Sequence, residues 1–123
     1  MRQSPAPDAH LVKWRGDTLE VTLELDSPRP GRAAFRTNAG RAAIRRAEII
    51  DETEKGITPM AKAWTDIPLP EIAPGVFSAS IQLREVGIFS GKPCFFPEGS
   101  SIPEWPEGRN FHVKVESAET RSN

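Results

Sequence analysis

Strict alternation of apolar and polar residues in short segments is the feature that most constrains the fold of this chain. In TLEVTLEL, residues 18–25, four apolar side chains share one face, and Thr or Glu occupies each position between them. GVFSASIQLRE (75–85) and NFHVKVE (110–116) repeat this pattern. A period of two residues is typical of a β-strand with one buried face. Such strands must bury their apolar faces against one another, which predicts antiparallel sheets stacked face to face.

Weaker signals predict further short strands between these segments. Residues 33–37 (AAFRT) follow a turn, and residues 86–96 (VGIFSGKPCFF) read as a strand with bends at its glycines. Residues 60–69 (MAKAWTDIPL) are expected to form a short or edge strand, because prolines follow them. A short helical turn leading into an extended segment is expected within 38–50. Together these segments predict an all-β, immunoglobulin-like antiparallel β-sandwich of about seven strands.

The length and composition agree with a single β domain. A chain of 123 residues fits one domain, and its 12 prolines and 9 glycines are typical of many turns. We expect a flexible N-terminal tail at 1–14, the β-sandwich at 15–117, and at 118–123 a C-terminal tail or a linker to a catalytic domain missing from this chain.

Charge and cysteine content restrict the expected partners and location. The net charge of −1 gives no reason to expect nucleic acid or an anionic membrane as a partner. The apolar stretches are far shorter than the roughly 20 residues needed to span a bilayer, and the N-terminus lacks the apolar segment of a signal peptide. Cys94 is the single cysteine, which fits a reducing compartment. The sequence therefore predicts a cytoplasmic protein.

Three stretches taken together resemble a known family. WTDIPL (64–69), VFSASIQLREVGIFSGKPCFF (76–96) and PEWPEGRNFHVKVE (103–116) are similar to the N-terminal β-sandwich domain of bacterial α-amylase-superfamily glycoside hydrolases, including glycogen-debranching-like enzymes. The resemblance implies a non-catalytic accessory domain, a downstream catalytic domain of the same polypeptide as its partner, and α-glucan as a further ligand. The chain has no tyrosine, and so lacks the tyrosine corner of many immunoglobulin-like domains.

Tryptophans and nearby polar residues are the candidates for contact with sugar or with a neighbouring domain. An indole can stack on the C–H face of a sugar ring, while polar side chains bind its hydroxyl groups. The same indoles can instead close the open edges of a sandwich, and both interpretations stay open for Trp64 and Trp105. The candidate residues are Trp64, Asp66, Trp105, Glu107, Arg109 and Asn110.

The remaining reactive side chains predict no catalytic or metal site. His10 lies in the expected tail and His112 points outward from a strand, so two separated histidines and one cysteine fall short of the four ligands of structural zinc. Cys94 is expected to be a small buried apolar residue. We expect a solvated or interface surface from a group of nearby arginines, namely Arg32, Arg36, Arg41, Arg45 and Arg46.

Three functions are compatible with these observations. The first is an accessory domain that docks on an α-amylase-type catalytic domain and needs no cofactor. The second is an independent α-glucan-binding module, and the third is a protein-interaction sandwich unrelated to carbohydrate. An independent enzyme is the least favoured alternative, because no pair of carboxylates is placed by the sequence around a cleft.

Overall fold

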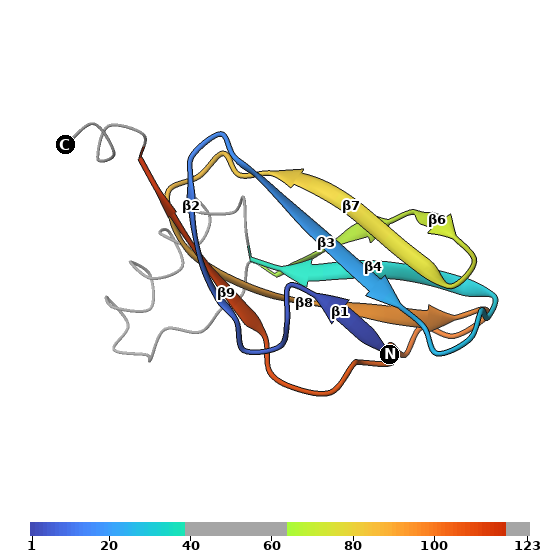
Figure 1. Ribbon diagram of the computed structural model, residues 1–123. Helices are drawn as coiled ribbons and strands as arrows, with labels where there is room; N and C mark the ends of the chain where they lie inside the picture. Colours follow the sequence, from blue (N-terminus) through green and yellow to red (C-terminus); the bar gives the residue numbers. More distant parts are fainter. Residues whose placement is uncertain (39–63, 118–123) are drawn as a thin grey trace, which may run out of the picture.

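Two β-sheets pack face to face in the computed structural model, which describes residues 1–38 and 64–117 (Figure 1). Within these residues all regular secondary structure is β, an arrangement consistent with a β-sandwich. The four-stranded sheet has the order β1 (Arg2–Ser4), β3 (Thr18–Glu24), β7 (Val76–Gln82), β6 (Glu71–Ala73). The five-stranded sheet has the order β2 (His10–Trp14), β9 (Phe111–Glu116), β8 (Gly87–Pro97), β4 (Gly31–Thr37), β5 (Thr65–Leu69).

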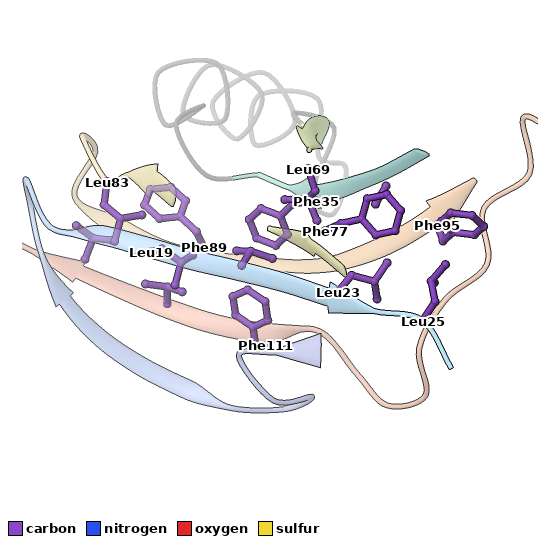
Figure 2. Close-up of a cluster of buried hydrophobic side chains, with 14 residues drawn as sticks. Leu19, Leu23, Leu25, Phe35, Leu69, Phe77, Leu83, Phe89, Phe95 and Phe111 are labelled. Carbon is purple, nitrogen blue, oxygen red and sulfur yellow. The ribbon is translucent and has the colours of Figure 1, made fainter. Parts of the chain in front are cut away.

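The core lies between the inner faces of the two sheets, as the alternating pattern predicts (Figure 2). The apolar positions of β3 and β9 are buried, and their polar neighbours point away from the core. Phe35 of β4 and Phe111 of β9 stack with their ring centroids 5.5 Å apart and their planes 2° apart. Each buried Phe, Leu or Val contributes about 1.5–3 kcal/mol by leaving water, so this layer is the main source of stability.

The strands predicted around 18–25, 33–37, 75–85, 86–96 and 110–116 are confirmed. The short or edge strand expected within 60–69 is confirmed in its described part by β5, which lies at the edge of the five-stranded sheet; residues 60–63 lie outside the described residues. The helical turn expected within 38–50, apart from Asn38, and the tail or linker expected at 118–123 lie outside the described residues.

The N-terminal segment differs from the flexible tail expected at 1–14. Two of its parts are strands: β1 pairs antiparallel with β3, and β2 pairs parallel with β9 (Figure 1). These two strands were not predicted, because each is short and the proline-rich stretch between them interrupts any local alternation. With β6, these strands raise the number in the described residues to nine, and the β2–β9 pair departs from a purely antiparallel arrangement.

No helix in the described residues has the length and apolar content needed to cross a membrane.

The inner face of β8 has a glycine where the stacked rings leave no room. A Cβ atom at Gly91 would collide with the ring of Phe35 and would lie 3.0 Å from the carbonyl oxygen of Arg36. Gly91 pairs with Phe111 on β9 and with Thr37 on β4, so it lies in the middle of the sheet. The absence of a side chain at this position therefore lets the Phe35–Phe111 stack lie flat against the sheet.

We predict that Gly91→Ala lowers the free energy of unfolding by about 1–3 kcal/mol, because the added methyl overpacks the core. In the background of Phe35→Leu the same substitution should cost less, since the smaller side chain leaves room for the methyl. Urea unfolding of the four variants in this cycle measures both effects. Ser80→Ala, at an exposed position of β7, is the control and should change stability by less than about 0.5 kcal/mol. Equal costs of Gly91→Ala in both backgrounds would contradict the packing explanation.

Candidate functional site

Two of the three tryptophans meet at a hollow on the outer face of the five-stranded sheet. The hollow has a volume of about 230 Å³. We call it the Trp105 patch; its lining residues are Arg36, Trp64, Lys92, Trp105 and Asn110. Arg36 of β4 and Lys92 of β8 are direct neighbours across the ladder, and Trp64 immediately precedes β5. Strands β4 and β8, the residue before β5 and the loop before β9 therefore build the patch.

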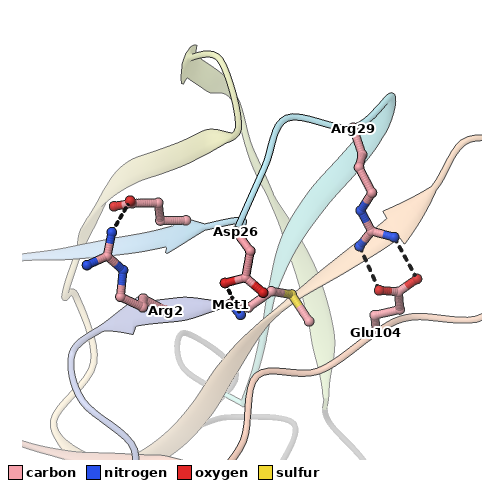
Figure 3. Close-up of polar contacts among 6 residues, drawn as sticks. Met1, Arg2, Asp26, Arg29 and Glu104 are labelled. Carbon is pink, nitrogen blue, oxygen red and sulfur yellow. Dashed lines mark hydrogen bonds and ion pairs between the residues drawn. The ribbon is translucent and has the colours of Figure 1, made fainter.

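Trp105 is held by its neighbours in the loop between β8 and β9. The backbones of Glu104 and Phe95 exchange two hydrogen bonds, of 2.7 and 3.0 Å. The Glu104 carboxylate accepts two further hydrogen bonds from Arg29, of 2.6 and 3.2 Å, which tie the loop to the turn between β3 and β4 (Figure 3). Pro106 on the other side is buried. These contacts on both sides fix the backbone from which the indole projects.

The Trp105 indole is partly exposed and is flanked by two cations. It is 39% exposed. The guanidinium carbon of Arg36 lies 5.3 Å from the ring centroid and the Lys92 ammonium lies 5.9 Å from it, within the range of cation–π attraction. Lys92 also donates a hydrogen bond to the carbonyl oxygen of Gly108. The Trp105 ring is therefore neither buried in the core nor fully exposed. It is a partly exposed ring with two cationic side chains beside it.

The carboxylate beside the patch is committed to an ion pair. Arg36 donates two hydrogen bonds to Asp66, of 2.7 and 3.0 Å, from Nε and Nη2. The hydrogen bond from Arg36 lowers the pKa of Asp66 below its ordinary value, and the same bond raises the pKa of Arg36. Asp66 is therefore ionised at neutral pH, and it orients the guanidinium instead of acting as a general acid.

The structure brings four of the six predicted site residues together and leaves two outside. Trp64, Trp105 and Asn110 line the patch, and Asp66 joins it through Arg36. Glu107 instead lines a second hollow, which also includes Trp105 and the N-terminal residues Met1, Arg2 and Gln3.

Arg109, the other residue outside the patch, is exposed, and its carbonyl oxygen accepts a 3.3 Å hydrogen bond from the Asp8 amide.

Lys92 was not among the predicted site residues, and Arg36 was predicted only as part of a group of nearby arginines. Both occupy outward positions of strands whose inward neighbours enter the core. The alternation alone could therefore have assigned them to the outer face. Their meeting with Trp105 depends on the pairing of β4 with β8, which a single sequence does not give. Arg41, Arg45 and Arg46 lie outside the described residues.

Cys94 is buried, as the sequence analysis predicted. It belongs to a small cluster with Ala34 and Phe96, on the face of the sheet opposite to the main core. Burial raises the pKa of the Cys94 thiol to about 11, so the sulfur is protonated and weakly nucleophilic at neutral pH.

The two histidines, which the sequence analysis treated as separated, lie side by side. Parallel pairing of β2 with β9 aligns His10 with His112. Their ring centroids are 4.9 Å apart and their planes differ by 25°. The two histidines were expected to lie apart because residues 1–14 were expected to form a flexible tail.

A larger hollow, of about 580 Å³, lies between the β3–β4 turn and β6. Prolines, Arg29, Glu71, Ile72 and Ala73 line it. None of its lining residues in the described part of the chain is aromatic, so we place the candidate site at the Trp105 patch, where indoles and charged groups converge.

Comparisons with known proteins identify no family for this chain. No protein-family model matches it, and no curated protein matches it. The resemblance to accessory domains of α-amylase-type enzymes therefore stays a hypothesis.

The Asp66–Arg36 pair makes a testable contribution to stability. Folding lowers the pKa of Asp66. The ion pair therefore stabilises the folded protein at pH values above the ordinary pKa of 3.8, and this stabilisation is lost as the pH falls through the lower pKa of the folded state. We predict that Asp66→Asn destabilises the protein by at most about 1 kcal/mol at neutral pH, because the pair is partly exposed. The difference from the parent should shrink as the pH falls below 3.8.

Urea unfolding as a function of pH measures this difference. Glu20→Gln, which removes an exposed carboxylate from the other sheet, controls for the change in net charge. A constant offset between Asp66→Asn and the parent at every pH would contradict the ion-pair explanation.

Proposed function

We propose that this chain is a non-catalytic accessory domain with an immunoglobulin-like topology. The strand orders β1-β3-β7-β6 and β2-β9-β8-β4-β5 support the topology. If β1 and β2 are the two halves of the immunoglobulin strand A, the four-stranded sheet corresponds to the ABED sheet. The five-stranded sheet then corresponds to the GFC sheet, with the second half of A beside G and one further strand beyond C.

The Trp105 patch is the observation that carries the proposal. An exposed indole with an arginine and a lysine beside it combines the residue types that dominate binding at protein interfaces, Trp and Arg above all. The contacts of Glu104 hold the loop in place before binding, which reduces the entropy lost on association. A partner surface with acidic or carbonyl groups around an apolar centre would complement this patch.

The proposal that the domain is non-catalytic is supported by the ion pairs of the two carboxylates near the patch. Asp66 is paired with Arg36, and Glu104 is paired with Arg29. Acid–base hydrolysis of a glycosidic bond needs one carboxyl group with a raised pKa and a second one across the bond. The pKa values of Asp66 and Glu104 are both lowered, because each accepts hydrogen bonds from an arginine.

The identity of the partner is proposed from the resemblance in sequence. It points to a catalytic barrel of the α-amylase type in the same polypeptide, with the Trp105 patch as the docking surface. In this function the domain covers part of the barrel surface and helps to position α-glucan.

A second candidate function, an independent α-glucan-binding module, is favoured by one further observation. Trp64 and Trp105 line the same hollow, together with the Asn110 amide and two cationic side chains. Aromatic rings with adjacent hydrogen-bond donors can bind a neutral sugar chain. The position of Arg36 and Lys92 near the Trp105 ring disfavours stacking on the face that they cover.

Docking predicts that Trp105→Ala weakens association with the catalytic barrel by about 30-fold or more, since loss of a central tryptophan typically costs at least about 2 kcal/mol. Calorimetric titration of the separately produced barrel with this chain measures the change. Ile72→Ala, which removes an exposed apolar side chain from β6 on the other sheet, is the control and should bind like the parent. Unchanged binding by Trp105→Ala would exclude the patch as the docking surface. A gene that encodes no α-amylase-type barrel with this domain would exclude the proposed partner.

The two functions differ in their response to sugar alone. If the domain acts by docking, millimolar maltoheptaose should leave the tryptophan fluorescence of the chain unchanged. A saturable change that Trp105→Ala abolishes, and that Trp14→Phe retains, would favour the independent glucan-binding module. Trp14 is a suitable control because it lies at the end of β2, outside the patch.

A further inference from the structure

We propose that Asp8, His10 and His112 form a surface binding site for a divalent transition-metal ion that prefers imidazole ligands, represented by Zn²⁺. One nitrogen of each imidazole and one carboxylate oxygen of Asp8 lie within 4.8 Å of one another. Two histidines and one carboxylate are a ligand set that zinc and related ions accept, with water completing the coordination. This site is separate from the Trp105 patch and is independent of the proposed docking function.

The fold places the three ligands together by two features of the backbone. Parallel pairing of β2 with β9 puts His10 directly beside His112, on the outer face of the sheet. Asp8 lies in the turn before β2 with a φ of 63°, a left-handed conformation that aspartate tolerates better than most residues.

Backbone hydrogen bonds fix this turn to the beginning of β9. The Asp8 amide donates to the Arg109 carbonyl at 3.3 Å, and the His112 amide donates to the Ala9 carbonyl at 2.8 Å. The relative positions of the three ligands are therefore set by main-chain contacts, and metal binding needs only small side-chain rotations.

Ser90 provides an orienting contact to one of the imidazoles. Its hydroxyl lies 2.7 Å from Nδ1 of His112, across the ladder between β8 and β9. In the tautomer in which Nδ1 donates to this hydroxyl, Nε2 carries the free lone pair that a metal needs. At metal sites, the ring nitrogen of a ligating histidine that does not bind the metal usually donates a hydrogen bond of this kind. Ser90 is itself fixed, because its amide donates to Asn38 Oδ1 at 2.9 Å.

The ligand spacing requires only a modest contraction. Tetrahedral zinc with bonds of about 2.0–2.1 Å places its ligand atoms about 3.3 Å apart. The present separations of at most 4.8 Å exceed this by roughly 1.5 Å or less, which rotation of the exposed His10 and Asp8 side chains can supply. A bound ion would connect the turn, β2 and β9, and so would clamp the N-terminal strand onto the sheet.

Titration of the untagged chain with Zn²⁺, followed by NMR of the imidazole protons, tests this site. We expect binding of one equivalent, shifts in the signals of both histidines, and a rise in the melting temperature. His10→Gln should weaken binding by about tenfold or more, and Asp8→Asn should weaken it while keeping a residue that tolerates the left-handed turn. Ser90→Ala should lower the affinity by about 10–100-fold and change the tautomer of His112, which the ¹⁵N shifts of its ring report.

Two control variants separate the site from general effects of substitution. Val12→Gln changes the next outward position on β2, and Asp26→Asn removes another exposed carboxylate; both should bind Zn²⁺ like the parent. The proposal is overturned if millimolar Zn²⁺ leaves the histidine signals unchanged, or if His10→Gln binds as tightly as the parent. His10 is exposed, so its variant tests the site without disturbing the core even if a variant of His112 fails to fold.

Discussion

Burial of one face of each sheet against the other is the constraint on which the rest of this structure depends. The inner positions of β3, β7, β4, β8 and β9 supply most of the leucines, valines and phenylalanines of one continuous core. Because side chains alternate along a strand, the same burial sends every second residue outward. Arg36, Lys92 and His112 are outward residues of this kind, so their places on the surface follow from the packing of their neighbours.

The loop between β8 and β9 connects this core to the candidate site. It pairs with Phe95 through Glu104, and the same glutamate binds Arg29 in the turn between β3 and β4. Trp105 follows directly, with its ring near Arg36 and Lys92. The position of one exposed indole therefore depends on contacts from the five-stranded sheet and from the turn that joins the two sheets. A ring whose backbone is fixed in this way loses less entropy on binding. This supports the interpretation of the Trp105 patch as an interface.

Much of the fold could be predicted from the sequence because its signal is local. The alternation in 18–25 and 110–116 identifies both the strands and their buried faces, and the buried state of Cys94 follows from its apolar neighbours. The β2 strand could not be found in this way, since His10 to Trp14 gain their partners only when the two ends of the domain meet. The neighbouring histidines were missed for the same reason. Trp64, Trp105 and Asn110 were found as residue types suited to binding, whereas their convergence with Lys92 depends on long-range pairing.

Oxidative footprinting of the tryptophans by hydroxyl radicals tests the role of the Trp105 patch most directly. The measurement compares this chain alone with the chain bound to the proposed catalytic barrel and reads the oxidation of each tryptophan by mass spectrometry. We expect Trp105 to be readily oxidised in the isolated chain and protected in the complex, while the oxidation of Trp14 changes little. Equal oxidation of Trp105 in both states, within a complex that demonstrably forms, would contradict the assignment of this patch as the contact surface.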